Sequence, residues 1–287
     1  LGNLDTYFVN ASTGSRPYGM DGGITLWTKD ANKDGRLNKD DGDFAYLYIG
    51  MRRGGRNYYA LDVTDINNPR LMWQITGGSA GFEALGQTWS RPVKSKVVFD
   101  NVKYDVLIFG GGYDATTQDK PDPDGPATRT ADTMGNAIYI VDALTGAKIW
   151  SAGKDNTYNE WDSTMVYGIP SEIRVLDMNQ DGIADQLYFG DMGGQIWRFD
   201  IYNTDNDNLL KQSVDITKIA DLGGSDAASN RRFYYPPDLA LAIEGKDRYL
   251  SLAIGSGYRA HPLNTAIEDR FYMIKQFATH AKPADTW

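Results

Sequence analysis

The sequence contains no cysteine and only two histidines, His261 and His280. Without cysteine there is no disulfide, no thiolate metal site and no thiol nucleophile, and the redox compartment stays undetermined. Two histidines are too few for a multi-histidine metal centre. These absences exclude several common kinds of catalytic and metal site before any motif is considered.

Positive charge is also scarce, because 29 Lys and Arg face 38 Asp and Glu, for a net charge of −9. Such a chain suits neither nucleic acid nor an anionic membrane surface, whereas divalent cations are suitable partners. No apolar run approaches the roughly 20 residues that span a bilayer, so we expect no transmembrane segment. The chain starts with neither an initiator Met nor a signal peptide, and we interpret it as a fragment of a longer, exported protein.

Aromatic residues and glycine are abundant, with 18 Tyr, 7 Trp and 31 Gly. Aromatic side chains favour strands, and glycine favours the turns between them. No long segment has a 3.6-residue hydrophobic period, so helix should be minor, with one short piece within 206–219. The composition therefore indicates a β-rich protein.

One unit recurs four times along the chain: a strand, a turn, a second strand that ends in a glycine-rich bend, and a third strand. Apolar residues alternate with other residues in these strands, as a half-buried strand requires. The second strands lie within 44–56, 104–114, 185–194 and 248–259, and the third strands within 58–63, 136–142, 194–200 and 270–275. The spacing exceeds the ~40–50 residues of a typical propeller blade, which predicts insertions near 118–132, 151–168 and 203–237.

A β-meander repeated around an axis is a β-propeller. We therefore predict an all-β fold, a modified and incomplete β-propeller with long loop insertions, as a single domain over residues 1–287. Four units are few for a closed ring, so either the ring is small and irregular or further blades lie outside this fragment. A stacked β-sandwich is the alternative fold.

Residues 177–185, with the sequence DMNQDGIAD, match a calcium-binding loop over nine positions. Calcium prefers six to eight oxygen ligands, and such a loop presents side-chain oxygens from positions 1, 3, 5 and 9 and a carbonyl from position 7. Strand patterns flank the loop, and Tyr188 stands where an EF-hand has its bidentate Glu, so we place the loop in a β-hairpin. The predicted calcium ligands are Asp177, Asn179, Asp181, Ile183 through its carbonyl, and Asp185.

The alternative is a turn without metal, since Asp, Asn and Gly favour turns in any case. The equivalent turns at 99–105 and 243–248 are shorter and lack the ligand pattern, so the hairpin can close without it. Three carboxylates in one loop repel one another unless a cation compensates. We therefore favour calcium.

A second loop, residues 30–41 with the sequence DANKDGRLNKDD, repeats the pattern at positions 1, 3, 5 and 6. Its basic residues lower the local negative charge, and Asp is short for a bidentate ligand, so a solvated turn is the alternative. The candidate ligands of this second calcium site are Asp30, Asn32, Asp34, Arg36, Asn38 and Asp41.

Two further motifs are weaker. Residues 142–150, DALTGAKIW, resemble the tryptophan-docking repeat of quinoprotein dehydrogenases, in which Asp and Thr-Gly shape a turn and Trp docks on the next blade. The vicinal cysteine pair common in those enzymes is absent, so we favour a structural contact between blades. Arg52, Arg53 and Arg56 stand beside two aromatics, where they can bind an anionic partner, form ion pairs or face water.

Three segments together resemble the C-terminal domain of the PilY/PilC family, which comprises type IV pilus tip-associated biogenesis factors and adhesins. They are 50–63, 177–200, and 255–263 with 269–272. The resemblance implies a modified β-propeller at the bacterial cell surface, on the pilus tip or associated with the outer membrane. It also implies a calcium site at 177–185, type IV pilus components such as minor pilins as partners, and attachment to host or abiotic surfaces.

The sequence therefore supports three hypotheses. The first is a calcium-binding, non-enzymatic domain in which calcium occupancy modulates pilus extension, retraction and surface attachment. The second is a quinone-dependent dehydrogenase, and the third is an inert propeller scaffold for protein partners. Ca²⁺ is the only cofactor that we expect.

Overall fold

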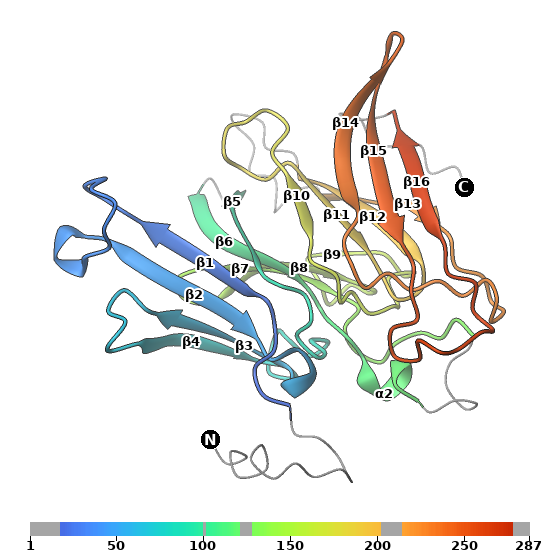
Figure 1. Ribbon diagram of the computed structural model, residues 1–287, viewed down its shortest axis with the longest axis horizontal. Helices are drawn as coiled ribbons and strands as arrows, with labels where there is room; N and C mark the ends of the chain where they lie inside the picture. Colours follow the sequence, from blue (N-terminus) through green and yellow to red (C-terminus); the bar gives the residue numbers. More distant parts are fainter. Residues whose placement is uncertain (1–17, 100–101, 121–127, 202–213, 278–287) are drawn as a thin grey trace.

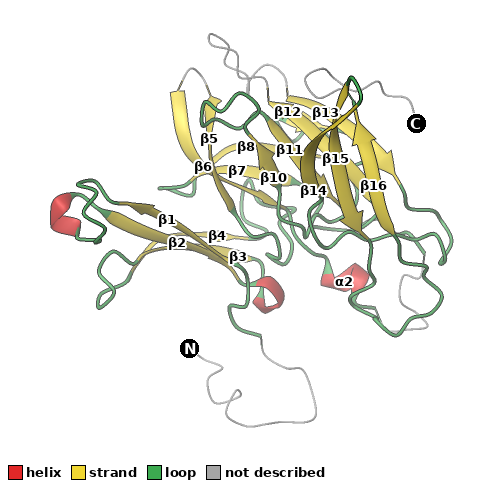
Figure 2. Cartoon of the chain, turned by 45° about the horizontal axis from the view of Figure 1, so that its top comes forward, coloured by secondary structure: helices red, strands yellow, loops and turns green. Residues whose placement is uncertain are grey.

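The computed structural model describes residues 18–99, 102–120, 128–201 and 214–277. Within these ranges the chain forms four β-sheets that follow one another in chain order. In Figure 1 they stand side by side, from the blue first sheet to the red fourth sheet. Helix is limited to short pieces at the ends of the sheets, as Figure 2 shows.

The first and second sheets are antiparallel meanders, apart from one added strand. The first has the order β1 (Ile24–Lys29), β2 (Phe44–Gly50), β3 (Asn57–Asp62) and β4 (Arg70–Thr76). The second has the order β5 (Val93–Phe99), β6 (Val102–Gly110), β7 (Ile138–Asp142), β8 (Lys148–Gly153) and β9 (Glu160–Trp161). Strand β9 pairs with β8 in parallel and extends this sheet by one short strand.

The third and fourth sheets repeat the plan. The third has the order β10 (Arg174–Leu176), β11 (Gln186–Gly190), β12 (Gln195–Ile201) and β13 (Val214–Asp221). The fourth is three-stranded, with β14 (Asp238–Glu244), β15 (Asp247–Gly255) and β16 (Phe271–Gln276). The predicted second and third strands of all four units are thus confirmed as β2 and β3, β6 and β7, β11 and β12, and β15 and β16.

Two segments expected to be irregular contain regular structure. Strand β9 lies within 151–168, and β13 lies within 203–237. Of the short helix expected within 206–219, residues 206–213 lie outside the described residues, whereas 214–219 belong to β13. The described α-helix is α2 (Ala115–Gln118), whose first turn is capped by the Asp114 carboxylate. None of the helices in the part of the chain that the structure describes has the length and apolarity to cross a membrane.

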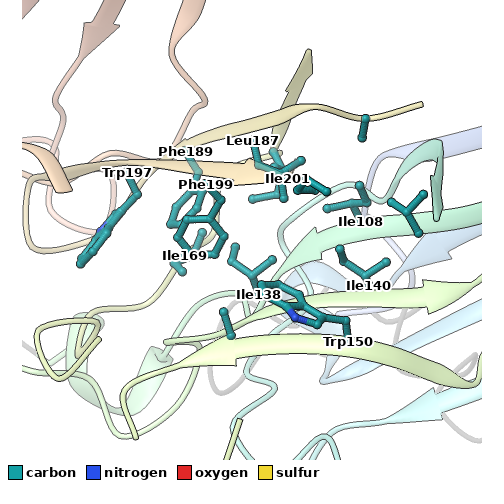
Figure 3. Packing of buried hydrophobic residues seen from close by; sticks show 14 of the residues in the cluster. Ile108, Ile138, Ile140, Trp150, Ile169, Leu187, Phe189, Trp197, Phe199 and Ile201 are labelled. Atoms are coloured by element: carbon teal, nitrogen blue, oxygen red, sulfur yellow. The ribbon is translucent and has the colours of Figure 1, made fainter. Parts of the chain in front are cut away.

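Neighbouring sheets pack face to face, because alternate side chains of each strand point to opposite faces. Figure 3 shows Ile138 and Trp150 of the second sheet against Leu187 and Phe199 of the third. The ring of Trp150 meets that of Phe199 edge-on, with ring centroids 6.2 Å apart. Similar clusters fill the space between the first and second sheets and between the third and fourth. The alternation of apolar residues along the strands therefore produces three hydrophobic clusters, one between each pair of neighbouring sheets.

The row of sheets does not close into a ring, because the described residues contain no strand that joins the fourth sheet to the first. The outward faces of these two sheets carry exposed apolar side chains. Ile24 and Leu26 of β1 are 52% and 58% exposed, and Phe271 and Met273 of β16 are 71% and 67% exposed. The fold is thus an all-β, modified propeller whose sheets are not closed, as predicted.

Candidate calcium loops and the comparisons with known proteins

The loop between β10 and β11 forms a compact turn built on its own side chains. Asp177 Oδ2 accepts a hydrogen bond from the Gly182 N–H at 2.8 Å, and Asn179 Oδ1 accepts one from the Asp181 N–H at 3.0 Å. Asp181 Oδ1 accepts one from the Ile183 N–H at 2.8 Å. The side chains of positions 1, 3 and 5 therefore fold back onto the backbone N–H groups of their own loop.

The backbone of this loop needs left-handed conformations at two positions. Gln180 has φ of 65° and Gly182 has φ of 82°, a region that favours glycine and costs most other residues about 1 kcal/mol or more. Asp185 closes the loop, because its Oδ2 accepts a hydrogen bond from the Met178 N–H at 2.6 Å. Position 9 thus faces the same loop as positions 1, 3 and 5.

The main loop is fixed to the core at its C-terminal end. Ile183 and Ala184 are buried, and the Ala184 N–H donates to the Lys96 carbonyl of the second sheet at 2.9 Å. The Asp185 N–H donates to the Leu176 carbonyl at 2.8 Å, which closes the hairpin. The C-terminal end of the loop is therefore joined both to β10, the partner of β11, and to the second sheet.

The loop at 30–36, between β1 and β2, has the same internal hydrogen bonds as 177–183. Asp30 Oδ2 accepts from the Gly35 N–H at 2.8 Å, Asn32 Oδ1 from the Asp34 N–H at 3.0 Å, and Asp34 Oδ1 from the Arg36 N–H at 2.8 Å. Positive φ again falls at positions 4 and 6, with 60° and 78°. Both loops join the first and second strands of their sheet, so the protein builds the same turn twice at the same place in the repeat.

The two loops differ in the carboxylate that closes them. In the second loop the N–H of position 2, that of Ala31, donates to Asp43 Oδ1 at 2.7 Å, and the Asn38 N–H donates to Asp43 Oδ2 at 2.9 Å. Asp43 thus has the place that Asp185 has in the main loop. Sequence reasoning missed Asp43, because it lies outside the twelve-residue motif.

Asn38 and Asp41 were predicted from the sequence as ligands, and in the structure their side chains form a hydrogen bond with each other. Asn38 Nδ2 donates to Asp41 Oδ2 at 3.0 Å, and Asn38 Oδ1 accepts from the Asp40 N–H and caps the 3₁₀ helix η1 (Lys39–Asp41). The structure therefore brings Asp30, Asn32 and Asp34 together and directs Asn38 and Asp41 to the helix cap.

Charge repulsion is visible in the main loop. Burial raises the pKa of Asp185, and the neighbouring carboxylates of Asp181 and Asp177 raise it further, whereas hydrogen bonds from Met178 and Asn179 oppose the shift. In the second loop, hydrogen bonds from Asn38 and Ala31 lower the pKa of Asp43. Across the described ranges no three or more His, Cys, Asp or Glu side chains converge as a metal cluster, since these carboxylates turn towards backbone N–H groups.

The turn at 142–146 is a contact between blades. Asp142 Oδ1 accepts from the Thr145 N–H at 2.8 Å and from its hydroxyl at 2.8 Å. Trp73 of the first sheet lies on this turn, and its Nε1 donates to the Ala143 carbonyl at 3.0 Å. A side chain at Gly146 would meet the Trp73 ring at 2.8 Å. In the motif that resembles a quinoprotein repeat, the turn is therefore the surface on which Trp73 packs.

The arginine-rich segment that follows β2 is divided between two roles. Arg56 Nε donates to the Leu85 carbonyl at 2.7 Å and supports a loop. Arg53 pairs with Asp119 at 2.6 Å, and Arg52 lies 3.8 Å from Asp21. Arg52 and Arg53 line a cavity, whereas Arg56 does not.

The fold of the chain is similar to that of a known protein. The crystal structure of the Pseudomonas aeruginosa PilY1 C-terminal domain has a similar fold, with a TM-score of 0.58 and 22% sequence identity over 85% of this chain and 48% of that one. The fold is therefore that of a β-propeller domain in the modified, open form seen here. The family model of the PilY1 β-propeller domain matches residues 8–234, and the chain belongs to this family. The resemblance to the PilY/PilC family is confirmed.

Two proteins of similar sequence are named as PilY1 or as a PilY1 homolog. The type IV pilus biogenesis factor PilY1 of Pseudomonas aeruginosa is 33% identical over 245 residues, which are 84% of this chain. A PilY1 homolog of Xylella fastidiosa is 28% identical over 195 residues, or 66% of this chain. The matched region covers 18% and 11% of these two relatives, so the chain corresponds to a small part of each.

Proposed function

We propose that this propeller domain is a calcium-binding, non-enzymatic part of a type IV pilus biogenesis factor. Calcium occupancy then modulates pilus extension and retraction and attachment to surfaces. The relatives named as pilus biogenesis factors supply the setting. The loop at 177–185 carries the calcium proposal, because its residues supply the oxygen types of an EF-hand-like ligand set and its side chains shape one compact turn.

The donor set of the main loop suits a hard cation. Its oxygens come from the carboxylates of Asp177, Asp181 and Asp185, the amide of Asn179 and the carbonyl of Ile183, which are the ligand types that calcium prefers. Bound calcium supplies positive charge that offsets the repulsion among the three carboxylates. This repulsion is a smaller cause of the raised pKa of Asp185 than burial is.

The second loop offers a similar set with one change from the sequence pattern. Asp30, Asn32, Asp34 and the Arg36 carbonyl occupy the equivalent positions, and Asp43 replaces Asp185. Asp30 Oδ1 is buried and has no hydrogen-bond partner in the protein. A buried carboxylate oxygen without a partner is costly, and a cation would satisfy it.

The response of the domain to calcium follows from how the main loop is anchored. Ordering residues 177–185 fixes the start of β11 through the Asp185 N–H and the edge of the second sheet through the Ala184 N–H. The surface formed by these two sheets then has a more rigid rim. A partner that binds the ordered rim more tightly than the loose rim couples calcium to assembly.

The proposed place of action is the bacterial surface. An exported propeller at the pilus tip or on the outer membrane meets calcium outside the cell, and its partners are type IV pilus components such as minor pilins. Host or abiotic surfaces are the proposed targets of attachment. No chemistry is assigned to the domain, because the quinoprotein-like turn at 142–146 is occupied by Trp73.

Isothermal titration with Ca²⁺ tests the proposal. We expect two binding events for the domain, with Kd values within about 10⁻⁷ to 10⁻³ M. Asp181→Ala should remove one event and Asp34→Ala the other, because each deletes the position-5 ligand. Asp43→Asn should weaken the second event, whereas Asn38→Ala should leave its affinity within about twofold.

Asp65→Ala is the matched control. Its carboxylate also accepts a backbone N–H bond in an exposed turn, from Asn67, but it lies outside both loops. Unchanged stoichiometry in Asp181→Ala and Asp34→Ala would remove calcium from the proposed function. Loss of binding in Asp65→Ala as well would point to non-specific binding by surface carboxylates.

A further inference from the structure

Three arginines from two distant parts of the chain surround one tryptophan. The guanidinium carbons of Arg52, Arg53 and Arg259 lie 4.5, 5.5 and 5.4 Å from the centre of the Trp89 ring. These residues line a cavity of about 280 Å³, and the rest of its wall consists of three tyrosines, Asp21 and Ala260. We call this cavity the arginine pocket.

Hydrogen bonds and tight backbone packing fix the segment that places Arg52 and Arg53 in the arginine pocket. The N–H groups of Met51 and Arg52 both donate to Thr88 Oγ1, at 2.8 and 3.2 Å. Arg52 has φ of 52°, a conformation that costs a residue with a side chain roughly 1–2 kcal/mol. A Cβ atom at Gly54 would lie 1.8 Å from the Gly19 carbonyl oxygen, so glycine is required there. The chain tolerates strain to place Arg52 and Arg53.

The positive charge of the pocket is only partly compensated. Arg53 forms two hydrogen bonds with Asp119, at 2.6 and 3.2 Å, whereas Arg52 forms a longer ion pair with Asp21, at 3.8 Å. Arg259 donates to the Tyr235 hydroxyl at 2.9 Å, and no carboxylate within the described ranges forms an ion pair with it. A chain of net charge −9 thus concentrates cations at one place.

A second and larger cavity adjoins the arginine pocket. It has a volume of about 490 Å³ and shares Tyr234 and Arg259 with its neighbour. Its other walls include Tyr258, His261 and Pro262, which give it an aromatic and partly apolar surface. A ligand that reaches Arg259 from the larger cavity therefore passes aromatic walls before it meets the guanidinium groups.

We propose that these joined cavities bind an acidic peptide segment of a partner protein. One or two carboxylates of the peptide lie on the guanidinium groups of Arg52 and Arg259, and the adjacent residues lie against the aromatic walls of the larger cavity. Arginine binds carboxylate through two parallel N–H donors, which gives the site its preference for this group. Tryptophan, tyrosine and arginine are also the residues enriched at the energetic centres of protein interfaces.

The site is separate from the calcium loops. The arginine pocket is built from the segment before β1 and from connections that follow the C-terminal ends of β2, β4, β6, β13 and β15, whereas the calcium loops precede the N-terminal ends of β2 and β11. The two kinds of site therefore lie at opposite ends of the strands. Peptide binding should persist in a calcium chelator, so a failure of the calcium proposal is distinguishable from a failure of this one.

Fluorescence anisotropy with two peptide pools tests the inference. Each labelled pool has randomised flanks around a fixed centre, Glu-Glu in one and Gln-Gln in the other. The acidic pool should bind at least about tenfold more tightly, as expected for charge-assisted pairs. Arg259→Gln should weaken binding of the acidic pool by at least about tenfold, and Arg259→Lys should restore only part of it. Asp21→Asn should tighten binding by about twofold, because it frees Arg52.

Arg248→Gln is the matched control, because Arg248 is an exposed arginine at the start of β15, whereas Arg259 follows the opposite end of that strand. It should bind the acidic pool as the unaltered protein does, and circular dichroism should show that every variant is folded. Equal binding of the two pools, or no effect of Arg259→Gln, would overturn the inference. Binding of polygalacturonate in preference to the acidic pool would also overturn it, in favour of an acidic glycan.

Discussion

Asp132 is a buried carboxylate held between two hydrogen-bond donors. Gln118 Nε2 donates to its Oδ1 at 2.8 Å, and the Gly168 N–H donates to its Oδ2 at 2.6 Å. Burial raises the pKa of Asp132 to about 7, although these two donors favour the ionised form. The folded protein therefore binds a proton at Asp132 more tightly than the unfolded chain does.

This shift has a definite sign in stability. Asp132 contributes stability that is fully present below the unfolded pKa of about 3.9 and is lost as the pH rises through the folded value of about 7. Replacing Asp132 by Asn should remove a slope of up to about 1.4 kcal/mol per pH unit over that window. Urea unfolding at a series of pH values, as the difference from the unaltered protein, measures it. Parallel curves for the two proteins would contradict the shift.

At the scale of the element, the turn at 142–146 is where Trp73 of the first sheet packs against the second sheet. Gly146 has φ of 73°, and a Cβ atom there would approach the Trp73 ring to 2.8 Å. Gly245, in the hairpin between β14 and β15, has a similar φ of 64° but has no atom within 4 Å of the Cβ position. The two glycines share a backbone conformation and differ in what surrounds them.

Alanine substitution at these two positions separates strain from packing. Gly245→Ala should lower the free energy of unfolding by about 1 kcal/mol, the cost of the left-handed backbone alone. Gly146→Ala should lower it by about 2–4 kcal/mol, because the Trp73 contact is lost or strained as well. Chemical denaturation of both variants measures the difference. Equal losses would mean that Trp73 does not hold the first sheet to the second.

The repeated strands could be predicted from the sequence because apolar residues alternate along them and because the second strand of each unit ends in glycine. Strand β13 was harder to predict from the sequence, because it follows a long connection and pairs with β12 through a bulge at Ile196 and Trp197. Asp43 could not be assigned to the second loop, because it reaches Ala31 only after the η1 helix has turned the chain back. The arginine pocket depends on contacts between residues far apart in sequence, such as Arg259 and Trp89, which no local pattern encodes.

At the scale of the whole molecule, the two outermost sheets are one-sided. Their inner faces are packed, whereas Leu26 of the first sheet and Phe271 of the fourth are 58% and 71% exposed on the outward faces. Exposed apolar patches of this kind promote association. The isolated chain therefore presents two faces that favour burial.

We expect the isolated chain to self-associate as its concentration rises. Leu26→Lys and Phe271→Lys together should shift it towards the monomer, because each places a charge on an outward face. Sedimentation velocity over a concentration series measures the shift. Lys154→Glu, in an exposed turn, serves as the control. A monomeric unaltered chain at every concentration would contradict the expectation.

The row of sheets also determines how the domain would carry a mechanical load. Apart from the contacts of the arginine pocket, a pulling force that enters at the first sheet and leaves at the fourth crosses the three hydrophobic clusters one after another. Connections in series yield at their weakest member. The cluster between the third and fourth sheets is the smallest of the three in the described part of the chain, so rupture under tension would start there and leave the sheets that carry the calcium loops joined.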